Sequence, residues 1–101
     1  MSKSSLIELV ERNRGEIVDF FRGFLRARSP NPPGNTSDAA ACVERFLGER
    51  GIDYRLVGPD PDRPNMVSSF DAPHPGRNLI LNGHIDVFPV GDGGGWSHDP
   101  W

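Results

Sequence analysis

The chain has 101 residues, 25% of them charged and 36% hydrophobic, with a formal net charge of −3 at pH 7, so we expect a single small soluble domain. Its Lys and Arg residues are scattered among acidic ones, with neither the basic stripe typical of nucleic-acid binding nor a polybasic membrane patch. The N-terminus lacks the apolar core of a secretory signal and no segment is long enough to cross a bilayer, so a cytoplasmic location is expected.

The first predicted element is an amphipathic helix over residues 6–24, where apolar side chains recur at helical spacing. Ser4 or Ser5 can cap its start. Gly15 costs the helix about 1 kcal/mol relative to Ala, which allows a break or kink near that residue. We expect the aromatic side chains of this stripe to pack in a core rather than to bind a ligand.

The segment SPNPPG at residues 29–34 ends that helix, because each proline fixes its own φ and keeps the preceding residue out of the helical region. We interpret it as a rigid connector without chemistry. A second helix is predicted from Thr36, its cap, to Gly51, where the apolar Ile52 that follows fits a left-handed glycine cap. Cys42, the only cysteine, flanks the apolar face and is predicted to be a buried, unreactive thiol, and it excludes an internal disulfide.

Three strands are predicted in the second half of the chain. Residues 53–57 and 65–70 show strand alternation and are separated by a proline-rich loop. The apolar run at residues 79–81 is too short for a helix and is typical of a buried strand. If that strand continues, Asn82, His84 and Asp86 share one face, with neighbours about 7 Å apart.

A glycine-rich loop follows Asp86 immediately, so these polar side chains lie where a strand gives way to a loop. In open α/β sheets, ligands bind at that edge. Zinc prefers nitrogen ligands, and a ligating His usually donates its second ring N–H to a carboxylate. On these residues alone, however, a strand-end histidine with a satisfied hydrogen bond is the simpler interpretation. The loop lacks a phosphate-binding fingerprint, which disfavours a nucleotide-binding module.

The run GHIDVFPVGDGGGWSHDPW at residues 83–101, together with SPNPPGNT at residues 29–36, resembles the start of the dizinc aminoacylase and carboxypeptidase family. That family includes acetylornithine deacetylase, succinyl-diaminopimelate desuccinylase, aminoacylase-1 and carboxypeptidase G. The resemblance implies the α/β fold class: residues 1–101 would be the N-terminal portion of a three-layer α/β/α zinc-hydrolase catalytic domain. Two helices would be followed by about three strands, incomplete and without the family's dimerisation domain.

The same resemblance implies His84 as the first zinc ligand, Asp86 as the acid that orients a ligand imidazole and supports catalysis, and Trp96 as a residue lining the substrate pocket. It implies two zinc ions, for which cobalt or manganese can substitute. The reaction would be amide-bond hydrolysis by a metal-activated water, on a small N-acyl amino acid or a peptide-like substrate. The parent protein could be a homodimer.

In the family the remaining ligands and the general base come from later segments, so we expect this chain to be inactive alone. The alternative is a non-catalytic fragment or interaction module that lacks the complete metal site. An apolar strand such as residues 79–81 also needs strands beside it and helices over both faces, which the predicted elements hardly supply. We therefore expect the isolated chain to be marginally stable or prone to aggregation.

Overall fold

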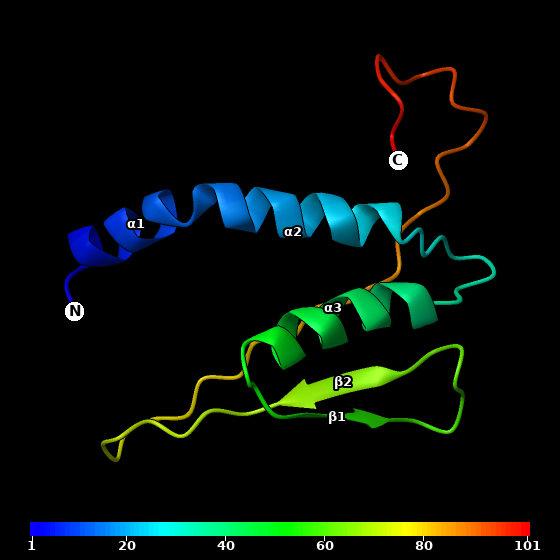
Figure 1. Ribbon diagram of the computed structural model, residues 1–101. Coiled ribbons are helices and arrows are strands. Elements are labelled where there is room, and N and C mark those ends of the chain that lie inside the picture. The colour runs from blue at the N-terminus through cyan, green and yellow to red at the C-terminus, as the bar shows by residue number, and fades with distance from the viewer.

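A computed structural model describes all 101 residues and contains three helices and one two-stranded sheet. The elements are α1 (Lys3–Arg12), α2 (Arg14–Arg26), α3 (Ser37–Glu49), β1 (Tyr54–Val57) and β2 (Asn65–Ser68). Figure 1 shows α1 and α2 following one another along one line, α3 beside α2, and the hairpin of β1 and β2 on the other side of α3. The predicted class, an incomplete α/β domain, is confirmed. No helix here combines the length and the apolar character that a bilayer crossing requires.

The first predicted helix is broken at Asn13, two residues before Gly15. The Asn13 side chain donates a hydrogen bond from Nδ2 to the Leu9 carbonyl oxygen at 2.7 Å, and such local amide bonds compete with the helical ladder. The predicted cap at Ser4 or Ser5 is wrong. Ser2 caps α1, its Oγ accepting from the Ser5 N–H at 3.1 Å, because the helix begins one turn earlier than its apolar stripe.

Helix α3 begins directly after Thr36, at the predicted position, but the capping bond comes from another side chain. Asn35 Oδ1 accepts from the Ser37 N–H at 3.0 Å, whereas the Thr36 side chain makes no capping bond. Thr36 is buried, and its own N–H donates to the Asp62 carbonyl oxygen at 2.8 Å. The start of α3 is therefore tied to the loop between the two strands.

The predicted glycine cap at the end of α3 is confirmed. Gly51 has φ +63°, and its N–H donates to the Gly48 carbonyl oxygen at 3.1 Å. The Ile52 N–H donates to the Leu47 carbonyl oxygen at 3.0 Å. This pair of bonds is the Schellman arrangement, which satisfies carbonyl groups that the last helical turn leaves without partners.

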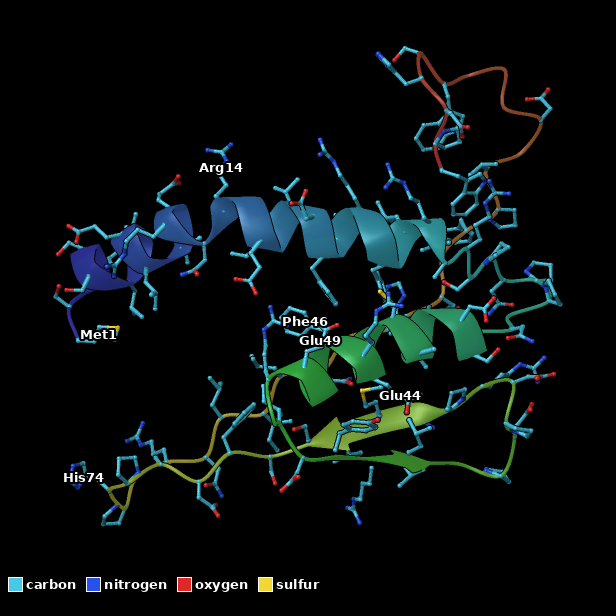
Figure 2. All side chains as sticks on the ribbon, viewed as in Figure 1. Met1, Arg14, Glu44, Phe46, Glu49 and His74 are labelled. Carbon is cyan, nitrogen blue, oxygen red and sulfur yellow. The ribbon has the colours of Figure 1, made fainter.

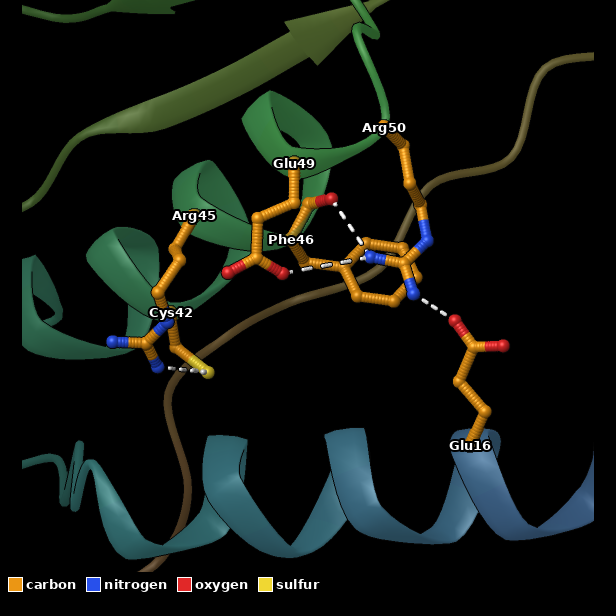
Figure 3. Close-up of polar contacts among 6 residues, drawn as sticks. All are labelled: Glu16, Cys42, Arg45, Phe46, Glu49 and Arg50. Atoms are coloured by element: carbon orange, nitrogen blue, oxygen red, sulfur yellow. Dashed lines mark hydrogen bonds and ion pairs between the residues drawn. The ribbon is translucent and has the colours of Figure 1, made fainter.

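Helices α2 and α3 pack through aromatic side chains and an ion pair. The Phe20 and Phe46 ring centroids lie 4.5 Å apart, and the Arg50 Cζ lies 3.6 Å from the Phe46 ring centroid. Figure 3 shows Arg50 reaching across from the end of α3 to pair with Glu16 of α2. Cys42 is buried in the same interface, as predicted. The expectation that the whole aromatic stripe packs is wrong for Phe21, which is 56% exposed.

Replacing Phe46 with Ala is expected to lower the free energy of unfolding of the full-length gene product by about 2 to 3 kcal/mol. This value lies below the range for a fully buried Phe because the ring is only partly covered. The measurement is denaturant unfolding. Glu16→Ala is the comparison, because it removes the exposed ion pair with Arg50, worth about 1 kcal/mol or less, and leaves the Arg50 contact with the Phe46 ring in place. A loss in Glu16→Ala as large as that in Phe46→Ala would contradict the prediction, because the ion pair would then contribute as much as the ring contact.

The hairpin is antiparallel, with Tyr54 opposite Ser68 and Val57 opposite Asn65. Both predicted strands are confirmed; β1 begins one residue later than predicted, and β2 ends two residues earlier. The Tyr54 hydroxyl donates to Glu44 Oε2 of α3 at 3.0 Å, and this hydrogen bond is the main reason that the pKa of Tyr54 is raised. The bond ties β1 to α3.

The predicted third strand, at residues 79–81, does not form. Its three apolar side chains are between 81% and 86% exposed, and its backbone pairs with no neighbouring strand. Figure 2 shows the extended segment that precedes it reaching away from the helices, with His74 at its outer end. A buried strand needs hydrogen-bonded neighbours and covered faces, and these 101 residues supply neither to this run.

The chain encloses almost no core. Only 6 of the 101 residues are buried, and the largest of them are small side chains. The accessible surface is 8637 Å², about half as much again as the roughly 5,700 Å² expected for a folded monomer of this mass. The radius of gyration is 16.4 Å, compared with about 13 Å for a compact domain of this length. The helices and the hairpin are therefore formed, but most of their apolar side chains remain exposed to solvent.

Candidate functional site at His84 and Asp86

The segment that carries His84 and Asp86 is held by the connector after α2. The Val87 N–H donates to the Ser29 carbonyl oxygen at 3.0 Å, and the Asn31 N–H donates to the Val87 carbonyl oxygen at 2.8 Å. These two bonds form a parallel bridge between Pro30 and Val87. Ser29 is 4% exposed, and its hydroxyl donates to the Ile85 carbonyl oxygen at 2.5 Å. The connector therefore fixes the backbone on both sides of Asp86.

His84 and Asp86 contact each other through one ring nitrogen. His84 Nδ1 lies 3.1 Å from Asp86 Oδ1 and 2.8 Å from the Asp86 carbonyl oxygen. Both oxygens are acceptors, so Nδ1 carries the proton, and in the neutral ring Nε2 then carries a free lone pair. The His84 side chain is 83% exposed and Nε2 makes no hydrogen bond within the chain. This tautomer and this exposure suit a nitrogen that binds a metal.

A further side chain holds the other oxygen of Asp86. Asn31 Nδ2 donates to Asp86 Oδ2 at 2.9 Å. This hydrogen bond is the main cause that lowers the pKa of Asp86, with a smaller contribution from His84 and opposition from partial desolvation. A lowered folded-state pKa stabilises the fold above the unfolded pKa, and this contribution is lost as the pH falls through the folded value. At neutral pH the carboxylate is therefore ionised and able to accept from His84.

The donor set fits one ligand of a zinc centre. Catalytic zinc takes about three protein ligands and structural zinc about four, usually from His, Cys and carboxylates. No group of three or more His, Cys, Asp or Glu residues in the chain is arranged to hold a metal ion. His84 offers one nitrogen and Asp86 supports it as an outer carboxylate. The remaining ligands of such a centre would have to come from outside these residues.

An open groove of about 710 Å³ lies next to this pair, between α3, β2 and the segment that contains His84. Asn82 lines the groove together with His84 and Asp86, so the three polar residues predicted on one strand face border one space without forming a strand. Trp96 is not among the lining residues. It is 55% exposed, and its Nε1 donates to the Val90 carbonyl oxygen at 3.2 Å within its own loop. Its role as a pocket residue stays a prediction.

Sequence reasoning missed three residues around this pair: Ser29, Asn31 and Arg63. Arg63 pairs with Asp60 at 3.0 Å and donates to the Pro33 carbonyl oxygen at 3.0 Å, which braces the connector from the hairpin side. For Ser29 and Asn31, the available signal was a polar side chain on either side of Pro30 in the connector. Nothing local in the sequence indicates their partners, because Asn31 and Asp86 are 55 residues apart.

Comparison with known proteins gives relatives among curated enzymes. N-formyl-4-amino-5-aminomethyl-2-methylpyrimidine deformylase from Halalkalibacterium halodurans is 31% identical over 108 residues, which cover 100% of this chain and 25% of the relative. The enzyme of the same name from Bacillus subtilis is 29% identical over 100 residues, covering 96% and 24%. Succinyl-diaminopimelate desuccinylase from Cereibacter sphaeroides (strain ATCC 17025) is 36% identical over 77 residues, covering 73% and 19%.

The chain is related to the aminoacylase and carboxypeptidase family. The resemblance noted in the sequence is thereby confirmed, and these relatives are hydrolases of amide bonds. The chain spans about a quarter or less of the length of the relatives named here. No family profile matches it, and no solved structure matches it.

Proposed function

We propose that this chain supplies the first metal ligand of a longer zinc-dependent hydrolase that cleaves amide bonds. The observation that carries the proposal is the His84 ring, whose Nδ1–H is held by Asp86 while Nε2 stays free and exposed. It occurs in a chain whose relatives are named for the removal of formyl and succinyl groups. The proposed substrates are small N-acyl amino acids or peptide-like molecules.

The chain's own residues would prepare one ligand for the metal. Asp86 keeps the proton on His84 Nδ1, so that the lone pair of Nε2 points away from the carboxylate. Ser29 holds the backbone next to Asp86, and Asn31 holds the Asp86 carboxylate. Two zinc ions, or cobalt or manganese in their place, would polarise the scissile carbonyl and lower the pKa of the attacking water. The groove beside His84 offers space for a small substrate.

We further propose that the protein is a cytoplasmic homodimer, and that it acts on small molecules and not on nucleic acid or membranes. The scattered basic residues and the net charge of −3 disfavour binding to nucleic acid or to an anionic membrane. Size-exclusion chromatography coupled to light scattering of the full-length gene product would give its oligomeric state.

The experiment that tests the proposed reaction is hydrolysis of an acyl panel by the full-length gene product. N-formyl, N-acetyl and N-succinyl amino acids, and a dipeptide, would be compared for release of the free amine. We expect at least one of these substrates to be cleaved, activity to disappear after dialysis against a chelator, and Zn²⁺, Co²⁺ or Mn²⁺ to restore it. Cleavage that persists without metal would rule out the two-metal mechanism.

The second candidate is a non-catalytic fragment or interaction module. The uncovered surface and the single nitrogen donor favour it for the 101 residues by themselves. The intact mass of the native gene product separates the two candidates. A mass near 11.1 kDa supports the fragment, and a mass about four times larger, like that of the relatives, supports the hydrolase.

A further inference from the structure

The connector at residues 29–34 carries an asparagine that reaches the proposed metal ligand through Asp86. Asn31 Nδ2 donates to Asp86 Oδ2 at 2.9 Å, and Asp86 Oδ1 lies 3.1 Å from His84 Nδ1. The two carboxylate oxygens therefore have separate partners, one on each side. We propose that Asn31 is a positioning residue, which orients the Asp86 carboxylate and thereby fixes the tautomer and direction of His84. This inference rests on the proposed function, which makes His84 a metal ligand.

The backbone around Asn31 is anchored on both sides of Asp86. Ser29 Oγ donates to the Ile85 carbonyl oxygen, and the backbones of Ser29 and Asn31 bond to the N–H and carbonyl oxygen of Val87. Asp86 thus lies between two residues that the connector holds. With the backbone fixed, the remaining freedom of Asp86 is rotation of its side chain, and the Asn31 amide restricts that rotation.

The turn also closes against the Asn31 side chain. Gly34 is buried with φ +80°, and its N–H donates to the Pro30 carbonyl oxygen at 2.9 Å. A Cβ atom at position 34 would lie 3.1 Å from both Cγ and Oδ1 of Asn31. Only glycine gives the amide this space and adopts this backbone conformation without strain. The side chain of Asn31 is therefore confined between Gly34 and Asp86.

The chemistry requires a donor at position 31. An ionised carboxylate only accepts hydrogen bonds, and the amide –NH₂ only donates, so their contact has one possible direction. Without that donor Asp86 could rotate away from His84, and the ring could shift its proton from Nδ1 to Nε2. A proton on Nε2 would block the nitrogen that is proposed to bind zinc. Loss of an outer partner of this kind typically lowers metal affinity about 10- to 100-fold.

The test uses Asn31→Leu, which has similar volume but no donor, and Asn31→Asp, which has the same shape but is an acceptor. The protein is the full-length gene product with ¹⁵N-labelled histidine. The first readout is the ¹⁵N shift of the His84 imidazole nitrogens in metal-free protein, which distinguishes the Nδ1–H from the Nε2–H tautomer. The second is the Kd for Zn²⁺, measured by competition with a chromophoric chelator.

We expect Nδ1–H to dominate in the wild-type protein. In both Asn31 variants the share of Nε2–H should rise and the Kd for Zn²⁺ should increase about 10- to 100-fold. Asn35→Leu is the matched control. It removes an amide directly after the connector, one that caps α3 and makes no contact with Asp86, so it should leave the tautomer unchanged. If Asn31→Leu does not fold, Gly34→Ala should produce the same shift by displacing the Asn31 amide.

A wild-type tautomer and an unchanged Kd in folded Asn31 variants would overturn the inference. A shift in Asn35→Leu as large as that in Asn31→Leu would also overturn it, because general destabilisation would then explain the effect. The outcome is separable from that of the proposed function. If the wild-type protein cleaves no acyl substrate but the Asn31 variants change the His84 tautomer, the positioning role stands and the proposed reaction fails.

Discussion

Produced on its own, the 101-residue chain is expected to show helical circular dichroism without a cooperative thermal unfolding transition. Its accessible surface of 8637 Å² exceeds the roughly 5,700 Å² of a compact monomer of equal mass. Side chains that normally form a core are among those exposed: Leu81 is 86% exposed and Phe88 is 91% exposed. Helix α2 contacts only α1 and α3 to any extent, so most of its circumference faces solvent. The hydrophobic stabilisation that offsets chain entropy is therefore largely missing.

The measurement is far-ultraviolet circular dichroism during heating, together with size-exclusion chromatography. A compact domain of about 100 residues unfolds with an enthalpy of about 60 to 80 kcal/mol, which gives a narrow transition. We expect a broad, sloping loss of signal and a tendency to aggregate. The full-length gene product is the control and should show a narrow transition. A cooperative transition in a monodisperse sample of the short chain would contradict this expectation.

The elements that local chemistry determines could be predicted from the sequence. The end of α3 depends on residues within one turn of Gly51, and a single glycine followed by Ile52 was enough to predict it. The same holds for the hairpin, where a proline-rich loop separates two alternating runs. The break in the first helix was displaced from Gly15 to Asn13 because the Asn13 side chain bonds to the backbone, a contact that apolar periodicity does not report.

Features that depend on distant partners could not be predicted in the same way. The apolar run at residues 79–81 has the composition of a buried strand, but composition does not provide the neighbouring strands on which such a strand depends. The contact between His84 and Asp86 was accessible to sequence reasoning because the residues are two positions apart. The bond from Asn31 to Asp86 spans 55 residues and emerges only when the connector is folded against the later segment.

Replacing His84 with Ala is expected to remove zinc and hydrolytic activity together from the full-length gene product. His84 is the one histidine in the chain with Nδ1 held by a carboxylate, which leaves its Nε2 free to bind a metal. Losing an outer partner alone costs about 10- to 100-fold in metal affinity or activity, so losing the ligand itself should cost at least about 100-fold. Asp86→Asn retains the ligand and should fall within the smaller range. Zinc content by mass spectrometry and the initial rate of acyl-group release measure both effects.

His74→Ala is the matched control, because it removes the same imidazole from the outer end of the loop that Figure 2 shows far from the helices. It should leave zinc content and rate unchanged. Circular dichroism of His84→Ala should match that of the wild-type protein, because the side chain is 83% exposed and contributes little packing. A His84→Ala protein that keeps both its zinc and its activity would remove His84 from the site, and the contact with Asp86 would then have a structural role only.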